Sequence, residues 1–504
     1  MALACADPRN RGTRIALLFL AFTALLCIYL TWNSIQSRHS TIAAQFTQPS
    51  VTLLTNNDIT YPRQALDALS PQKAREFIDR LDAIRDVAFS PHYEFMNVHN
   101  LENVDRLLQY LERVEDGERL PAPRVVLSSW HFLPTCYEES SNGEVQWMRP
   151  LLELMQEQDI FIIYAAFPDK TFHTDFYLLG NDLITHAWMD DEHLIWCFQD
   201  PHSCMQSERN LEGIPLWKMF AFTFWGSLPR SGKWLPPPTD DTSWSFNPLG
   251  REWNLVPYQM PEGHFYIGYH YERCQALQYV PFAQRPDQIV VLAKKSEYFH
   301  NNALLLDPST FYTRLKNATG YHIVSNARVE DGYPIPEGLN NIGLLPQAEY
   351  DLQLANTKAL LGIGKPQISP TPYASLCRGV PVIIPYRSDT GCPARPGPNE
   401  YCGFYAEIHQ HGPAAAIGEP YIYTVDVTGP VEDIIQTIQR AVNTPIEPFE
   451  PEEMTKGAVR QRLLDYFDVD WEAHGEAKGF GTEELVLPPW LIDWSRRNPD
   501  PTLH

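Results

Sequence analysis

The chain has 504 residues, of which 44% are apolar and 12% aromatic, and it carries a formal net charge of −23. This length exceeds what one hydrophobic core usually serves, so we expect two domains with appended segments. The negative charge argues against nucleic acid and acidic polymers as partners, and the 43 prolines predict many loops.

The first candidate element is an uncharged run from Ile15 to Trp32. Its 18 residues are close to the minimum that spans a bilayer. A cleaved signal peptide is the alternative, but small residues mark its cleavage site, whereas Tyr29, Leu30 and Trp32 are bulky. Arginines precede the run, so the positive-inside rule leaves residues 1–14 cytosolic and the remaining chain lumenal. We therefore expect a type II, single-pass membrane protein with an uncleaved signal-anchor at 15–32.

The soluble part divides into a stem, two domains and a tail. Residues 33–62 are rich in Ser, Thr, Gln and Asn without helical periodicity, which is typical of a tether. Residues 64–115 carry apolar side chains at helical spacing, which predicts core-facing helices. We place the domain boundary at the Pro281–Pro286 connector, giving domains at 63–285 and 286–470 and a C-terminal tail at 471–504.

Seven cysteines follow the anchor, and a lumenal chain would expose them to an oxidising compartment. Seven is odd, so at least one stays unpaired. Cys392 and Cys402 flank a loop rich in Pro and Gly, while Cys197 and Cys204 are separated by a short segment. Either pair could close a local disulfide, but the sequence does not fix the connectivity. Asn317 heads the only glycosylation sequon.

The first domain alternates apolar runs with one clear helix. The runs cover 123–129, 160–165, 193–198 and 216–224, and the helix follows Gly143. This alternation predicts a parallel sheet with helical crossovers. Glu144 lies in the first turn of the helix, where the macrodipole favours a carboxylate, so the residues alone favour a structural role for it.

The second domain opens with a strand at 287–293 and contains a compact unit at 357–385. In this unit an apolar run at 359–361 ends in Gly362 and Gly364, which allow a sharp turn and a close approach of the backbone to a ligand. Two such glycines also serve simple chain reversals, so this signal alone is weak.

A short helix should follow the glycines. Ser369 can cap it and Pro370 can occupy its first position, before another strand at 380–384. A helix N-terminus beyond the carboxyl end of a parallel strand suits phosphate, so we expect a nucleotide there.

The amino-acid sequences of several segments resemble glycosyltransferase family 18. Leu361-Gly-Ile-Gly-Lys-Pro, Ser369-Pro-Thr-Pro and Cys377-Arg-Gly-Val-Pro resemble its donor-binding half. Gly143-Glu-Val-Gln-Trp and parts of 222–272 and 416–451 continue the likeness in order, over roughly residues 140–467. The resemblance implies an α/β fold of GT-B type, with two Rossmann-like domains facing a cleft.

This resemblance also implies a reaction and a place. The chain would be an inverting glycosyltransferase of the Golgi membrane that moves N-acetylglucosamine from UDP-GlcNAc to a mannose of an N-glycan, in β-1,6 branching. Two alternatives stay open: a catalytically impaired, membrane-anchored glycan-binding protein, and a related transferase with a different donor.

Site residues follow from the same resemblance. Glu144 would be the catalytic base, because attack of a sugar hydroxyl on an anomeric carbon needs one carboxylate to take the proton. Lys294, which could otherwise be a solvated surface lysine, would lie beside the donor diphosphate. The remaining donor-binding residues would be Gly362, Gly364, Ser369, Pro370 and Thr371.

Aromatic residues are candidates for the acceptor. Trp225 and Trp253 could stack on sugar faces, or they could simply pack the proline-rich loop between them. Both alternatives are open from the sequence.

The sequence also departs from the family at one position and contains one motif typical of metal binding. The family has a glutamate, of the kind that holds the donor ribose, where this chain has Ala374, and this puts the donor in doubt. Asp468-Val-Asp470 has the form of a metal-binding pair, but it follows an amphipathic helix at the end of the domain. We therefore expect no metal and no cofactor beyond the donor substrate.

Overall fold

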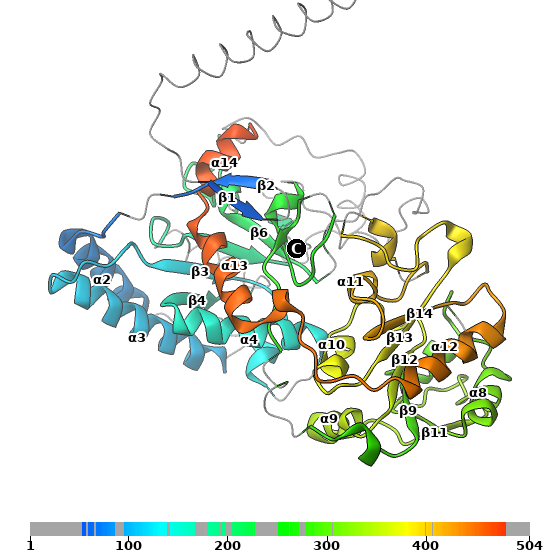
Figure 1. The fold of residues 1–504 in the computed structure, drawn as a ribbon. Coiled ribbons are helices and arrows are strands. Elements are labelled where there is room, and N and C mark those ends of the chain that lie inside the picture. Colours follow the sequence, from blue (N-terminus) through cyan, green and yellow to red (C-terminus); the bar gives the residue numbers. More distant parts are fainter. Residues whose placement is uncertain are drawn as a thin grey trace, which may run out of the picture. The chain divides into compact units, whose positions relative to one another are not determined.

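The computed structural model describes most of the chain after residue 52. The described residues are 53–56, 59–64, 67–85, 95–138, 142–166, 177, 180–190, 193–194, 196–197, 204–224, 226, 250–261, 263–271, 274, 279–304, 306–398, 400–405 and 407–479. Residues 54–504 form one compact unit, which contains two six-stranded parallel sheets (Figure 1). The predicted α/β class with two Rossmann-like domains is therefore confirmed.

The first sheet is built from the predicted first domain. Its strands, in spatial order, are β4 (Ile160–Tyr164), β3 (Arg124–Ser128), β5 (His186–Met189), β6 (Met219–Phe222), β7 (Asn254–Val256) and β8 (Phe265–Tyr266). All adjacent pairs are parallel. Helix α4 (Gly143–Glu157) connects β3 to β4, while α2 (Pro71–Arg85) packs against α3 (Met96–Glu115), which contacts β4 (Figure 1).

One strand lies earlier in the sequence than predicted. The apolar run at 193–198 was expected to be a strand, but its described residues 193, 194, 196 and 197 are helical, and β5 precedes them. The Leu194 N–H donates to the Asp190 carbonyl, which begins a helical turn directly after β5. Short apolar runs do not distinguish a strand from a buried helical turn, which explains the error.

The second sheet has the order expected for a nucleotide-binding domain. Its strands are β11 (Leu339–Asn341), β10 (His322–Ser325), β9 (Gln288–Leu292), β12 (Ala359–Gly362), β13 (Val382–Tyr386) and β14 (Ile422–Asp426). Its helices are α8 (Phe311–Thr319), α9 (Gln347–Ala355), α10 (Thr371–Leu376), α11 (Gly412–Ala415) and α12 (Val431–Asn443). The chain adds strands on one side of β9 and then, from β12, on the other. The gap between these two strands is thus the topological switch point, where α/β sheets bind ligands.

The C-terminal helices return to the first sheet. Helix α13 (Lys456–Asp468) places Tyr466 so that its hydroxyl accepts a hydrogen bond of 2.9 Å from the Trp188 indole of β5. Asp468 at the end of α13 pairs with Arg124 of β3. Figure 1 shows this orange segment beside the strands of the first sheet, although the sequence prediction grouped it with the second domain.

The end of the predicted stem and the start of the predicted tail are also folded. Strands β1 (Leu53–Asn56) and β2 (Ile59–Pro62) form a small sheet, and Tyr61 is fully buried. Helix α14 (Trp471–Ala477) packs its Trp471 ring 5.4 Å from that of Tyr61. Short 3-10 helices cover Pro134–Tyr137, Leu216–Lys218, Arg251–Trp253, Phe282–Gln284, Ser296–Phe299, Ser388–Thr390, Tyr401–Phe404 and Glu452–Met454.

The disulfides agree with the sequence prediction and add one bridge. Cys197 pairs with Cys204 and Cys392 pairs with Cys402, as the spacing allowed. A third bridge joins Cys274, shortly before the Pro281–Pro286 connector, to Cys377 at the end of α10. Cys136 is unpaired and buried, which accounts for the odd number.

The predicted anchor at 15–32 lies outside the described residues. Within the part of the chain that the structure describes, no helix has the length and apolar character needed to cross a bilayer.

Candidate donor site

A cavity of about 540 Å³ opens at the carboxyl edge of the second sheet. It lies at the switch point, because its lining residues come from the ends of β9 and β10 and from the segment between β12 and α10. The lining residues are Asn142, Gly143, Gln146, Tyr271, Val291 to Lys295, Asn326, Arg328, Leu344, Leu345, Gln347, Tyr350, Asp351, Leu354, Ser369, Pro370, Thr371 and Ala374. Its volume lies in the range that small-molecule and cofactor sites usually have.

Three cations line this cavity. Lys295 and Arg328 share the carboxylate of Glu330, at 3.9 and 2.9 Å respectively. Lys294 lies two residues after the end of β9, is exposed, and has no ion-pair partner among the residues described above. A free ammonium beside two partly neutralised cations makes this edge suited to an anionic group such as a diphosphate.

The turn before α10 brings three of the predicted donor residues to the cavity. Ser369, Pro370 and Thr371 all line it. The Ser369 hydroxyl accepts a 3.3 Å hydrogen bond from the Thr371 N–H and donates to the Thr371 hydroxyl at 3.1 Å. Helix α10 has only six residues, and Ser369 already satisfies one N–H at its start. The hydroxyls therefore carry more of the polar character of this wall than the helix terminus does.

The two predicted glycines support the turn from behind and do not line the cavity. Gly364 has a φ of +96°, which a glycine adopts without strain, so the turn itself requires it. Gly362 has ordinary backbone geometry, but a Cβ atom there would overlap Gln410 Oε1. The glycines thus admit close packing within the protein, where the sequence had suggested a close approach to a ligand.

Two buried polar atoms at the cavity have no partner among the described residues. Asn326 is 6% exposed, donates through Nδ2 to the Gly343 carbonyl at 3.3 Å, and leaves Oδ1 unpaired. Gln146 of α4 leaves its Nε2 unpaired. Unpaired buried polar atoms are costly unless a ligand or water completes them. The sequence analysis missed both residues, although Asn326 directly follows the last residue of β10, at the edge where ligands bind.

Glu144 lies at the start of α4, across from the 362–370 segment that precedes α10. Asn142 caps this helix, since its Oδ1 accepts from the Val145 N–H at 2.9 Å. A Cβ atom at Gly143 would lie 3.4 Å from the Pro370 side chain, so the starts of α4 and α10 nearly touch. Glu144 is half-buried and does not line the cavity itself, but its neighbours Gly143 and Gln146 do.

The surroundings of Glu144 include a buried tyrosine. The pKa of the Tyr258 phenol is raised well above its ordinary value, mainly by burial, then by Tyr373, with a smaller contribution from the Glu144 carboxylate. Tyr258 packs parallel to Tyr373 at 5.7 Å. These two rings also line a second cavity of about 380 Å³, which contains Tyr266 and the carboxylates of Glu400, Glu452 and Glu453.

The predicted acceptor tryptophan Trp253 is a packing residue. It is fully buried, its indole N–H donates to the Trp217 carbonyl at 3.1 Å, and its ring stacks on His474 at 5.3 Å. A buried ring offers no face to a sugar, so the acceptor assignment of Trp253 is wrong in this structure. Trp225 lies outside the described residues.

Ala374 lies on the cavity wall, where its methyl group leaves no hydrogen-bonding side chain. The carboxylate that lines this cavity is that of Asp351 on α9, which is buried and lies 3.3 Å from Arg378 Nη2. Gln347 also donates to Asp351 at 3.1 Å. The cavity therefore contains a carboxylate, although not on the helix that the family resemblance implied.

The acidic motif near the C-terminus has structural partners. Asp468 pairs with Arg63 at 2.7 Å and with Arg124, and the Asp470 side chain accepts from the Ala473 N–H at 2.9 Å to cap α14. No cluster of metal-ligating side chains occurs in the described ranges. Asn317, the sequon residue, is exposed near the end of α8.

Comparison with known proteins agrees with this geometry. Residues 265–472 match the family model described as glycosyltransferase family 18. The chain is 25% identical over 247 residues to alpha-1,6-mannosylglycoprotein 6-beta-N-acetylglucosaminyltransferase A of Cricetulus griseus, and this match covers 45% of the chain and 31% of that relative. The B enzyme of Mus musculus is 29% identical over 138 residues, which cover 26% of the chain and 17% of that protein.

Solved structures give weaker matches. A Methanocaldococcus jannaschii UDP-GlcNAc 2-epimerase has a TM-score of 0.33 at 10% identity, covering 68% of this chain and 99% of that chain. An alpha-glucosyltransferase solved with UDP has a TM-score of 0.34 at 7% identity, covering 71% of this chain and 98% of that chain. These scores are too low to support any argument about this chain.

The two parallel-sheet domains and the matched segment make this chain similar to glycosyltransferases. More narrowly, residues 265–472 are similar to glycosyltransferase family 18, whose model they match. The chain spans only about a third of the length of the first relatives, so the activity of the whole protein is a separate question.

Proposed function

We propose that this chain is an inverting transferase that moves N-acetylglucosamine from UDP-GlcNAc to a mannose hydroxyl of an N-glycan, in β-1,6 linkage. The observation that carries the proposal is the cavity at the switch point of the second sheet. On its wall, Lys294 has no ion-pair partner and Asn326 Oδ1 has no hydrogen-bond partner among the described residues. The names of the relatives supply the donor and acceptor classes.

In this proposal the cavity holds the nucleotide end of the donor. Lys294, Ser369 and Thr371 surround the diphosphate, and Lys294 stabilises the charge that develops on the leaving UDP. Asn326 lines the same cavity, and its acceptor oxygen, which has no partner among the described residues, would accept a hydrogen bond from a nucleobase N–H.

Glu144 is the proposed base. It lies on the first-domain side of the cleft, one residue from Gly143, which nearly touches the donor turn at Pro370. The carboxylate would take the proton of the attacking mannose hydroxyl, and a single displacement at the anomeric carbon inverts its configuration. No covalent intermediate and no second carboxylate are needed.

The proposed reaction uses no metal. The three cations on the cavity wall can neutralise a diphosphate, while Asp468 and Asp470 are engaged in an ion-pair cluster and a helix cap. We also propose that residues 15–32 anchor the protein in the Golgi membrane with the two domains in the lumen, where Asn317 would be glycosylated. The apolar run, the disulfides and the exposed sequon support this placement.

A second candidate is favoured by Ala374, which leaves the cavity wall without the family's carboxylate. This alternative takes two forms: a glycan-binding protein whose catalysis is impaired, or a related transferase that uses a different donor. Under this alternative, UDP-GlcNAc binds weakly because the ribose lacks a charged partner on α10, a loss of about 1.5–3 kcal/mol.

A transfer assay tests the proposal. The folded protein is incubated with UDP-GlcNAc and a biantennary N-glycan, and mass spectrometry follows the gain of one N-acetylhexosamine. Transfer by the wild type, and weaker UDP binding by Lys294→Ala but not by the exposed Lys316→Ala, would support the proposal. Absence of product with a range of acceptors would contradict it.

Ala374→Glu separates the two candidates. If the missing carboxylate limits donor affinity, this variant should bind UDP roughly ten-fold more tightly than the wild type, while Ala374→Gln gains less. If Asp351 already serves the ribose, the added glutamate should crowd the cavity and weaken binding instead.

A further inference from the structure

The turn between β12 and α10 is supported by a segment that lies outside the cavity. We call residues 362–370 the donor turn, and it supplies Ser369 and Pro370 to the cavity wall. Three side chains from elsewhere in the sequence donate hydrogen bonds to its carbonyls. His411 Nε2 bonds Ser369 O at 2.8 Å, Gln410 Nε2 bonds Pro366 O at 3.1 Å, and Asn302 Nδ2 bonds Ile363 O.

The hydrogen bonds of His411 fix its tautomer. Its Nδ1 accepts from the Ala414 N–H at 3.2 Å, so Nε2 must carry the proton that it donates to Ser369. The imidazole is 1% exposed. It is held edge-on between the rings of Tyr258, at 5.2 Å, and Tyr373, at 5.5 Å. These contacts leave the ring one orientation.

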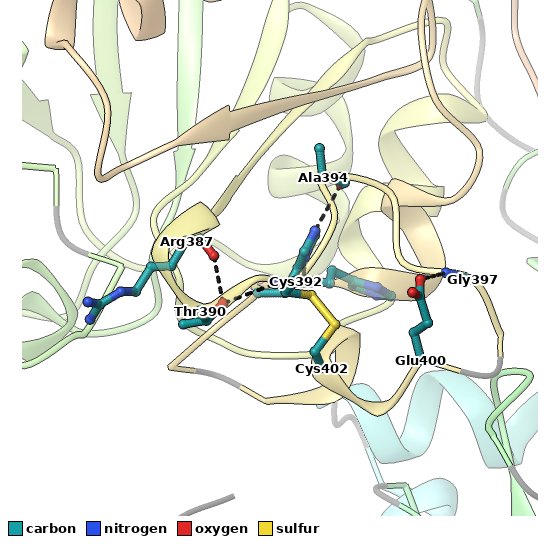
Figure 2. The surroundings of a disulfide bond; sticks show 9 residues. Arg387, Thr390, Cys392, Ala394, Gly397, Glu400 and Cys402 are labelled. Atoms are coloured by element: carbon teal, nitrogen blue, oxygen red, sulfur yellow. Dashed lines mark hydrogen bonds between the residues drawn. A yellow bond between two sulfur atoms is a disulfide. The ribbon is translucent and has the colours of Figure 1, made fainter. Parts of the chain in front are cut away.

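His411 is in turn connected to the disulfide loop. The His411 N–H donates to Nδ1 of His409 at 3.2 Å, and His409 Nε2 bonds the Ala394 carbonyl at 3.2 Å. Figure 2 shows this carbonyl within the loop that the Cys392–Cys402 disulfide closes. The donor turn therefore rests, through two buried histidines, on a covalently closed loop.

Gln410 explains the glycine at the start of the turn. Its amide is 1% exposed, and its Oε1 occupies the space that a side chain at position 362 would need. Gly362 thus belongs to the same arrangement: its missing side chain lets Gln410 reach the Pro366 carbonyl.

We propose that His411, assisted by Gln410, is a positioning residue that holds the donor turn in the geometry required for the nucleotide diphosphate. The proposal rests on the proposed function, because the diphosphate is assigned to this cavity there. Neither side chain lines the cavity, so each acts through the backbone of 366–369. A displacement of about 1 Å in a positioning element is enough to cost a large part of binding or rate.

Two substitutions at one position separate positioning from folding. His411→Asn keeps an acceptor near the place of Nδ1, so the Ala414 N–H stays capped, but it cannot reach Ser369. His411→Gln keeps a donor near the place of Nε2. We expect His411→Asn to raise the Kd for UDP at least ten-fold and to speed amide hydrogen exchange across 366–371 without UDP, while His411→Gln stays within about three-fold of the wild type.

The control is His186→Asn, which removes another buried histidine, from β5 of the first sheet. It should lower the unfolding temperature without changing the Kd for UDP. Wild-type UDP affinity in His411→Asn, or an equal loss in His186→Asn, would overturn the positioning role.

The positioning role can still be tested if the wild type binds no UDP or if His411→Asn does not fold. If the wild type binds no UDP, the proposed function fails, and hydrogen exchange alone decides: unchanged exchange across 366–371 in His411→Asn overturns the positioning role, and faster exchange supports it. If His411→Asn does not fold, Gln410→Leu tests the same turn. We expect this variant to show faster hydrogen exchange across 366–371 and a higher Kd for UDP than the wild type, and no change in either would overturn the positioning role.

Discussion

Glu144 is the residue on which the proposed chemistry depends most. Glu144→Gln keeps the shape of the side chain at the start of α4 and removes its basicity. Turnover should fall by about 10²–10⁴-fold, the usual worth of general-base catalysis, and the Kd for UDP should stay nearly unchanged. Steady-state kinetics and calorimetry on the same preparation measure the two effects.

Glu153→Gln on the same helix is the matched control, and it should keep its turnover. If Glu144→Gln retains most of its rate, Glu144 is only a favourable residue at a helix start. The base would then have to be another carboxylate on the cleft.

The buried histidines of the 409–411 segment make stability depend on pH. Burial lowers the pKa of His409 to about 4 and that of His411 to about 3, whereas an unfolded histidine titrates near 6.5. The unfolded state therefore binds more protons as pH falls below about 6.5, so stability is complete above this pH and decreases below it. At pH 5 each histidine should cost roughly 2 kcal/mol relative to neutral pH.

Urea unfolding at pH 7.5 and pH 5 measures this effect. His411→Gln removes one titrating group, so its stability should change less between the two pH values than that of the wild type. An equal change in the variant and the wild type would show that other groups carry the pH dependence.

At the scale of elements, α13 connects the second domain to the first sheet. Asp468 is 5% exposed and pairs with Arg63 and Arg124. Asp468→Asn should destabilise the fold by about 2–3 kcal/mol, below the usual cost of breaking a fully buried pair, because the Arg63 side chain is 38% exposed. Asp470→Asn should change little, since asparagine caps a helix as well as aspartate does.

This pair also distinguishes structure from metal binding. If Asp468 and Asp470 held a catalytic metal, both variants would lose activity together. Under our account, Asp468→Asn loses thermal stability, Asp470→Asn is near wild type, and both keep their kcat below the unfolding temperature.

Most elements could be predicted because their periodicity was clear. The strands β3, β4, β6, β9, β12 and β13 appeared as apolar runs, and helix α4 appeared as helical spacing. The strand prediction for 193–198 was wrong because six mostly apolar residues fit both helical and strand periodicity. The hydrogen bond from the Leu194 N–H to the Asp190 carbonyl, which favours a helical turn, cannot be read from the sequence.

The candidate site was predicted where chemistry followed a strand end. Lys294 follows the end of a predicted strand, and Ser369 and Thr371 belong to a segment that resembles the family; all three line the cavity, and their donor role stays a prediction. Trp253 was misassigned because an aromatic residue in a loop gives no sign of whether it is buried. His411 could not be found, because its role depends on contacts with Ser369 and Ala414 that lie outside any local pattern.

At the scale of the whole molecule, the account predicts a reaction that needs no divalent metal. Transfer should survive excess EDTA, because protein cations surround the diphosphate. Complete loss with EDTA, restored by manganese, would overturn this mechanism.

The central claim is that the cavity of the second domain holds the donor and that Glu144 faces it from the first. A crystal structure with UDP bound tests this claim most directly. We predict UDP in the cavity, with its diphosphate beside Lys294 and the 369–371 segment, its base beside Asn326, and the Glu144 carboxylate opposite the β-phosphate with room for a sugar between them. UDP bound elsewhere, or a Glu144 side chain turned away from the β-phosphate in that complex, would contradict the account.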